Sequence, residues 1–218
     1  MKILIVTAVP EEQQAIQNQI NKRKALSFEP EFLCTGPSVP FTVFALTQYL
    51  NNHTSIDLCI NAGICGSFSD EYPIGSALNI VSDTFADIGI VKTEKSADMF
   101  EAGFWQANRN GFSGKNLKNK TQISTGLPEV SGITVNMTSG RSEQIRRRIN
   151  KYNPDTESME GAGFAFVCEN YKLPWLQIRA VSNLIAQRHL QKWDIPLALE
   201  QLGMAVADFL ESLGKSKK

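Results

Sequence analysis

Two adjacent carboxylates follow the first apolar run of the chain. Glu11 and Glu12 come directly after KILIVTA, residues 2–8, and Pro10 can open a helix at this point. A carboxylate at such a strand-to-helix junction suits a general base that orients a water molecule. Acidic residues are also common in a first helical turn, where they favour the helix dipole. These residues alone leave both interpretations open.

A third carboxylate, Glu160, follows Met159 at the start of a small-residue, apolar stretch, ESMEGAGFAFVCE at 157–169. Because an ionised carboxylate only accepts hydrogen bonds, Glu160 could bind both hydroxyls of a ribose. A first-turn helix carboxylate without a ligand is the alternative here as well.

The stretch IRAVSNLIAQR, 178–188, contains an apolar run that stops abruptly at Ser182 and Asn183. This pattern indicates a buried strand that delivers two polar side chains to its carboxyl end, where α/β proteins bind ligands. An amide donates hydrogen bonds but gives up no proton at neutral pH. Asn183 therefore suits the stabilisation of a leaving group rather than its full protonation.

The glycine patterns of nucleotide-binding enzymes are missing. The first strand is followed by TAVPEEQ, which lacks the glycines of GxGxxG, and GxxxxGK followed by Ser or Thr is absent too. Two carboxylates at that turn would also repel phosphate. NAD and ATP are therefore disfavoured, and we expect no cofactor.

The composition is that of an ordinary globular protein, with 218 residues of which 42% are hydrophobic and 20% charged. Lys and Arg total 22, as do Asp and Glu, so no basic field predicts nucleic-acid binding. The two His and four Cys show no metal-ligand spacing, and no metal is expected. With no signal-peptide apolar region and no apolar stretch of ~18 residues, the sequence predicts no membrane partner and a cytoplasmic location.

Strand-like and helix-like segments alternate, which predicts an α/β fold with a largely parallel sheet in one domain over residues 1–218. We expect strands at 2–8, 31–36, 57–63, 77–85, 133–137 and 175–182, and helices at 10–21, 40–51, 143–151, 159–171 and 195–213.

Four shorter features carry specific predictions. Residues 63–66 are expected to form a small-residue loop, and Ser142 is expected to cap the third helix. The irregular segment 88–130, with its scattered aromatics, is expected to be a folded lid. The run Arg146–Arg148 lies in a predicted helix, which favours a solvated face.

Four motifs together resemble one family. MKILIVTAVPEEQ, INAGICGSF, SMEGAGFAFVC and IRAVSN occur in the order and at the spacing found in the nucleoside phosphorylase/nucleosidase superfamily. The resemblance is greatest to methylthioadenosine/S-adenosylhomocysteine nucleosidases and, closer still, to futalosine hydrolases of menaquinone biosynthesis. It covers most of residues 1–213 and is weakest over 95–130. It implies a three-layer α/β sandwich with a central mixed, largely parallel sheet flanked by helices.

The resemblance implies a role for each matching position. Glu12 would hold the attacking water, with Glu11 as the fallback. Met159 would pack against the ribose, whose 2′ and 3′ hydroxyls Glu160 would bind. Asn183 would contact purine N7.

Further positions follow from the same resemblance. Ala62, Gly63 and Gly66 would line the base and the ribose, and Ser182 and Arg179 would support the Asn183 loop. Relatives are often dimers whose partner completes the pocket for the 5′ substituent, which implies a homodimer.

Hydrolysis is favoured over phosphorolysis because Glu11 and Glu12 stand where hexameric phosphorylases of the superfamily carry a Gly-Asp-Pro-x-Arg turn. Asn183 indicates which purine base is released. Methylthioadenosine nucleosidases carry Asp at that position, and they carry Glu where this chain has Ser158. A 6-oxopurine presents acceptors at N7 and O6, and an amide NH₂ can donate to both. Adenine stays possible because the amide oxygen accepts from a 6-amino group.

The expected activity is therefore hydrolysis of futalosine, a purine nucleoside, with release of hypoxanthine. Futalosine carries a bulky 5′ extension that ends in an aryl carboxylate. Aromatics of 100–112 could cover the aryl group, and Arg188 could pair with the carboxylate or be a surface residue. The enzymatic alternatives are a methylthioadenosine/S-adenosylhomocysteine nucleosidase and a purine nucleoside phosphorylase. A nucleoside-binding protein without turnover is the alternative from another class.

Overall fold

The computed structural model describes residues 1–23, 29–53, 55–91 and 96–215. Its helices are α1 (Pro10–Asn21), α2 (Val39–Asn52), α3 (Ser142–Tyr152), α4 (Gly161–Tyr171) and α5 (Ile195–Lys215), with a 3₁₀ turn, η1, at Arg188–Leu190. The longer strands are β1 (Ile3–Thr7), β2 (Glu31–Cys34), β3 (Leu58–Ser67), β4 (Ala77–Asp83), β9 (Glu129–Thr134) and β11 (Trp175–Leu184). The shorter strands are β5 (Gly89–Val91), β6 (Ser96–Asp98), β7 (Phe112–Ser113), β8 (Asn116–Lys118) and β10 (Thr156–Ser158).

The central sheet is mixed and closes on itself. Strand β3 pairs in parallel with β1 on one side and β11 on the other, and antiparallel with β10 near its carboxyl end. Strand β11 pairs with β4, β4 with β9, and β9 with β10. The five strands β3, β11, β4, β9 and β10 thus form a ring, and β1 and β2 extend it on one side.

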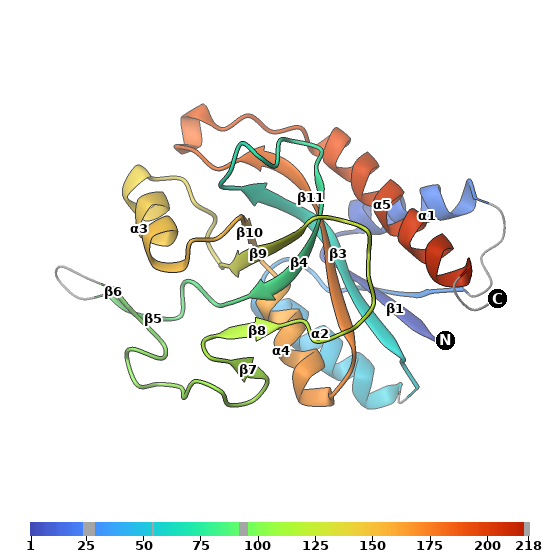
Figure 1. The fold of residues 1–218 in the computed structure, drawn as a ribbon, viewed down its shortest axis with the longest axis horizontal. Coiled ribbons are helices and arrows are strands. Elements are labelled where there is room, and N and C mark those ends of the chain that lie inside the picture. Colours follow the sequence, from blue (N-terminus) through green and yellow to red (C-terminus); the bar gives the residue numbers. More distant parts are fainter. Residues whose placement is uncertain (24–28, 54, 92–95, 216–218) are drawn as a thin grey trace.

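Helices cover both faces of the sheet, which confirms the expected fold class. Figure 1 shows α1 and α5 on one side of β1, β3 and β11, and α2 and α4 on the other. The side chains of strand β1 show the reason, because they point alternately to opposite faces of the sheet and pack into two separate hydrophobic cores. Ile3 and Ile5 pack toward α1 and α5, whereas Leu4 and Val6 pack toward α2 and α4. Among the described residues, no helix has the length and apolar character to cross a membrane.

The boundaries differ from the predicted ones where strand pairing overrides local composition. Strand β3 runs through Gly63 and Gly66, so the expected loop at 63–66 is wrong; β11 pairs with this stretch almost residue for residue. The short strand β10 was not expected, because three residues carry no readable period. Arg141, not Ser142, is the N-cap of α3.

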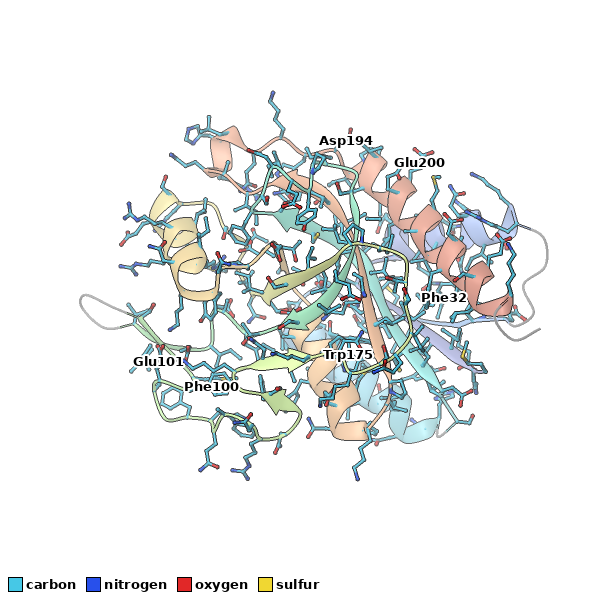
Figure 2. The ribbon with its side chains drawn as sticks, in the orientation of Figure 1. Phe32, Phe100, Glu101, Trp175, Asp194 and Glu200 are labelled. Carbon is cyan, nitrogen blue, oxygen red and sulfur yellow. The ribbon has the colours of Figure 1, made fainter. Side chains whose placement is uncertain are left out.

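The segment 88–130 forms two hairpins, β5–β6 and β7–β8, rather than a lid. Phe100, Trp105 and Phe112 pack against the core cluster that includes α4, and Phe112 contacts Phe100 edge to face at 5.3 Å. Figure 2 places Phe100 beside these hairpins. Phe100, Trp105 and Phe112 therefore fill the core beneath β7 and β8, whereas Phe104 is exposed, and a role of this segment in covering a ligand stays a prediction.

Arg148 also departs from prediction. It is buried rather than solvated, and its guanidinium donates to Glu157 and to the Ser139 hydroxyl, both at 2.8 Å. It also donates to the carbonyl of Met137 at 3.0 Å. The buried ion pair therefore fixes the turn that follows β9.

Candidate active site

The carboxyl ends of β1, β3 and β11 bring together most of the predicted site residues. The parallel register of β3 and β11 sets Gly63 opposite Arg179 and Gly66 opposite Asn183. The first turn of α1 adds Glu12, and the first turn of α4 adds Glu160. This is the edge at which α/β sheets bind ligands.

Glu12 is buried, and backbone N–H groups bind its carboxylate. Oε2 accepts from Ala8 at 2.9 Å and from Val9 at 3.3 Å, and Oε1 accepts from Ile64 at 3.0 Å. The residue thus caps its own helix and also joins α1 to β3. An ionised carboxylate has about four acceptor positions, so these three donors leave one free, on Oε1.

Gly63 keeps space open in front of that oxygen. A Cβ atom at position 63 would lie 2.7 Å from Glu12 Oε1 and would overlap the Arg179 guanidinium. Any larger residue would therefore push the carboxylate and the guanidinium apart. The glycine is required here by close approach and not by a turn.

Arg179 is the buried cation of the site, at 1% exposure. Its guanidinium donates to the Asn61 side chain and to Glu160 Oε2, the latter at 3.5 Å. Glu160 Oε1 accepts from the backbone N–H of Ser38 at 3.0 Å. The positive charge therefore acts on two carboxylates on different elements, on Glu160 through this contact and on Glu12 through the electrostatic field. A role of Arg179 in supporting the Asn183 loop stays a prediction.

The protonation of Glu12 reflects this environment. Burial raises the pKa of the Glu12 carboxyl, and the Glu160 charge adds to that effect. The Arg179 charge and the Ile64 N–H work against it and lower the pKa. The pKa of Glu12 therefore lies closer to neutral pH than that of an ordinary glutamate, which suits a group that takes up a proton during a reaction.

Asn183 lies on β11 just past a bulge at Ser182, where the register shifts. It is buried, and its Oδ1 lies 3.0 Å from the Ser182 hydroxyl, which is equally close to the carbonyl of Cys65 and can donate to one of the two at a time. Within the described part of the chain, its Nδ2 has no hydrogen-bond acceptor. The amide is thus oriented as a donor, and Gly66 leaves room beside it, since a Cβ there would lie 3.3 Å from Nδ2.

Other predicted residues are placed less centrally. Ala62 is buried in β3 opposite Ile178, and Met159 is half-buried next to Glu160. Arg188 is exposed in η1, beyond the Asn183 loop. Among the described residues, no group of His, Cys, Asp or Glu is arranged to hold a metal ion.

Asp83 stands at the end of a predicted strand, where a site was expected, but the sequence gave it no role; in the structure it supports Glu160. It is buried at the end of β4, where Oδ1 accepts from Thr134 Oγ1 at 2.9 Å and Oδ2 from Gln177 Nε2 at 3.2 Å. Thr134 Oγ1 in turn accepts from the N–H of Ala162 at 2.7 Å. This chain of contacts holds the first turn of α4, of which Glu160 is the N-cap.

Burial raises the pKa of Asp83 from 3.8 to about 6, with hydrogen bonds and Arg179 opposing the shift. The folded protein therefore holds this proton more tightly than the unfolded chain. The resulting stabilisation is complete below pH 3.8 and is lost as the pH rises through 6. We expect the free energy of unfolding of the wild type, relative to that of Asp83→Asn, to fall between pH 3.8 and about 6 by at most about 1.4 kcal/mol per pH unit, with a matching fall in melting temperature. If the melting temperatures of the wild type and of Asp83→Asn change with pH in the same way across this range, the assignment is contradicted.

The sequence did contain a signal for Arg179. A lone charge inside the apolar run LQIRAV must find buried partners, and the carboxylates Glu12 and Glu160 were already candidates. Asp83 gave a weaker signal, its place at the end of a predicted strand, because Asp at a strand end is also common in turns.

Chemically, the cluster combines a buried base with one free acceptor position, a second carboxylate and a buried amide donor. These groups suit a polar ligand with hydroxyls on one side and acceptors on the other.

Comparisons with known proteins agree with this arrangement. Residues 31–213 match the model of the phosphorylase superfamily. The chain is 32% identical over 164 residues to a futalosine hydrolase of Streptomyces coelicolor, covering 72% of this chain and 67% of that protein. The fold is similar to that of Helicobacter pylori futalosine hydrolase, with a TM-score of 0.73 at 16% identity over 99% of this chain and 98% of that one. It is equally similar to the 5′-methylthioadenosine/S-adenosylhomocysteine nucleosidase of Helicobacter pylori, with a TM-score of 0.74, the same identity and the same coverage.

Proposed function

This chain belongs to the phosphorylase superfamily, and we propose that it hydrolyses the N-glycosidic bond of futalosine, a step of menaquinone biosynthesis, and releases hypoxanthine. The relative in Streptomyces coelicolor supports the substrate. A nucleosidase for methylthioadenosine is less well supported, because the structure that carries that name is similar to this chain in fold at only 16% identity.

The observation that carries the reaction type is the free acceptor position on buried Glu12 Oε1 beside Gly63. Water that donates to this oxygen attacks C1′ of the ribose, and Glu12 takes its proton as the bond to the purine breaks. Glu160 accepts from the ribose hydroxyls, and Arg179 balances the charge of the two carboxylates. Asn183 Nδ2 donates to the departing purine, where negative charge develops.

Phosphate is a poor nucleophile for this site. Glu160 contacts Arg179 and Glu12 feels its charge, so the buried cation of this cluster is already compensated. A phosphate ion would meet two carboxylates and no spare guanidinium there.

A substrate panel tests the proposal. Futalosine, aminofutalosine, methylthioadenosine and inosine are incubated with and without phosphate, and free base is followed by chromatography. We expect phosphate-independent release of hypoxanthine from futalosine. Brisk methylthioadenosine cleavage without futalosine turnover would refute the substrate, and stimulation by phosphate or arsenate would refute the hydrolysis.

We also propose a homodimer in the cytoplasm. Phe41 and Phe44 on α2 are 58% and 69% exposed, and they lie one turn apart on the helix that begins next to Ser38. A second copy on this face would cover both rings close to Glu160. The four cysteines are free thiols, as in a reducing compartment.

The dimer proposal predicts that Phe44→Glu yields a monomer. A buried charge on each side of the interface would oppose association. Light scattering of the wild type and the variant measures the mass, and Gln14→Glu, at an exposed position of α1 on the other side of the sheet (Figure 1), is the matched control. A wild type that is monomeric at micromolar concentration would contradict the proposal.

A further inference from the structure

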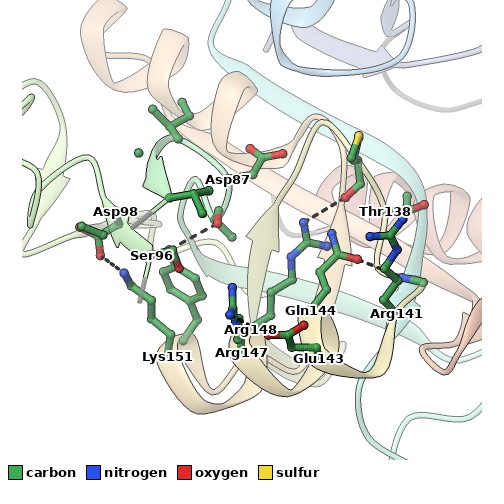
Figure 3. Close-up of a pocket in the computed structure, with 18 of the residues that line it drawn as sticks. Asp87, Ser96, Asp98, Thr138, Arg141, Glu143, Gln144, Arg147, Arg148 and Lys151 are labelled. Carbon is green, nitrogen blue, oxygen red and sulfur yellow. Dashed lines mark hydrogen bonds and ion pairs between the residues drawn. The ribbon is translucent and has the colours of Figure 1, made fainter. Parts of the chain in front are cut away.

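A hollow outside the cluster just described lies between the β5–β6 hairpin, the turn after β9, the start of α3 and η1. Its volume is about 690 Å³, within the range of small-molecule sites. Glu12, Glu160 and Asn183 are not among its lining residues. Figure 3 shows Arg141 and Thr138 on one side of it and Asp98 with Lys151 on the other.

The cations that line the hollow fall into two groups. Lys151 contacts Asp98 at 3.2 Å, Arg147 contacts Glu143 at 2.7 Å, and Arg148 contacts Glu157 at 2.8 Å, so these charges are compensated. Arg141 and Arg188 also line it, and within the described residues neither guanidinium has a carboxylate at ion-pair distance. Uncompensated guanidinium groups at a hollow favour an anionic ligand.

Arg141 and Arg188 are neighbours. The backbone N–H of Arg188 donates to the carbonyl of Gly140 at 2.9 Å, and Gly140 directly precedes Arg141. A Cβ at Gly140 would lie 3.5 Å from Cβ of Arg188. The two side chains therefore start from adjacent backbone at the same rim of the hollow.

One aromatic ring links this rim to the candidate active site. The Arg188 guanidinium lies over the Trp193 ring, 5.5 Å from its centroid. Trp193 pairs with Asn183 in an isolated β-bridge, and the N–H of Asp194 donates to the Ser182 carbonyl at 2.9 Å. Trp193 thus lies between Asn183, where the purine is proposed to bind, and the guanidinium of Arg188.

The rest of the lining suits an apolar body next to the anion. Met137 and Ile90 line the hollow and are 70% and 37% exposed. Three carboxylates also line it, but Asp87 accepts from Asn136, Asp98 pairs with Lys151, and Glu143 pairs with Arg147.

We propose that Arg188, with Arg141 beside it, binds the carboxylate of an aromatic 5′ substituent that occupies this hollow. The proposal rests on the proposed function, because it takes the purine and ribose to lie at Asn183 and Glu160. It assigns the selectivity for an anionic nucleoside to two surface arginines and not to the catalytic cluster.

The test compares futalosine with its carboxamide, which keeps the ring and loses the charge. We expect Arg188→Gln to lower kcat/KM for futalosine about tenfold, mainly through KM, and to change the value for the carboxamide much less. The loss should shrink as salt is added, since Arg188 is exposed. Arg146→Gln, an exposed arginine on α3 outside the hollow, is the matched control and should behave as the wild type.

Binding separates this proposal from the proposed function. Calorimetry in a Glu12→Gln background measures the affinity for futalosine without turnover, and adding Arg188→Gln should weaken it about tenfold. If the wild type cleaves futalosine but Arg188→Gln affects acid and carboxamide equally, the subsite is wrong and the function stands. If the wild type releases no base while binding still depends on Arg188 and on the carboxylate, the function is wrong and the subsite stands.

Discussion

Glu12→Gln is expected to lower kcat for futalosine by about 10²–10⁴-fold, the range associated with loss of a general base. The amide cannot take a proton from water, and it also fits the pocket poorly. If the Gln oxygen accepts from Ala8 and Val9, its NH₂ must face the Ile64 N–H. Two opposed donors should lower the free energy of unfolding by about 1–3 kcal/mol.

The neighbouring Glu11→Gln is the matched control. Glu11 is exposed in the same helical turn, and it is the fallback base suggested by the sequence. We expect its activity to stay within about twofold, as is usual for surface substitutions. Single-turnover rates at a temperature well below the melting point separate the loss of the base from the loss of stability. Equal losses in both variants would refute the assignment to Glu12.

The pH profile of the wild type gives an independent check. Because burial raises the pKa of Glu12, the acid limb of kcat/KM should lie above the ordinary glutamate value of 4.5. Rate falls as the pH drops through this limb, since only ionised Glu12 accepts the proton. Lowering the pH should leave futalosine binding less affected than its cleavage.

The sequence predicted the elements that depend on local composition. The helix from Pro10 to Asn21 has the predicted bounds, because Pro10, Glu11 and Glu12 form a recognisable start. The same first turn gave Glu12 as a candidate base. Its double role, capping α1 and contacting β3, could be seen only once the backbone N–H of Ile64 was placed.

Features that depend on pairing between distant segments were not predictable. The glycines at 63 and 66 suggested a loop, but in β3 their small size leaves room for Arg179 and Asn183 from β11. Arg148 looked solvated because its helix is rich in charge, and only the position of Glu157 on β10 explains its burial. Arg179 and Asn183 are far from the two glycines in the sequence, whereas Glu157 is nine residues from Arg148 but belongs to another element, and no local pattern predicts either contact.

Asn183→Asp is expected to change which base leaves. An ionised Asp would face the N7 and O6 acceptors of hypoxanthine and repel both, so futalosine cleavage should fall by about 10²–10³-fold. An adenine leaving group offers a 6-amino donor, which the carboxylate can accept. The ratio of aminofutalosine to futalosine cleavage should therefore rise by at least about tenfold.

Ser182 makes this prediction specific. Its hydroxyl lies 3.0 Å from both Asn183 Oδ1 and the Cys65 carbonyl, and when it donates to the amide oxygen the NH₂ of the amide faces the ligand. In Asn183→Asp the Ser182 hydroxyl can donate to one carboxylate oxygen, and the other oxygen then faces the purine base. Asn183→Ala removes both the donor and the charge, so it should slow both substrates and leave their ratio nearly unchanged. If Asn183→Asp also leaves the ratio unchanged, the amide does not select the base, and selectivity must come from elsewhere in the pocket even if Glu12 and Glu160 act as proposed.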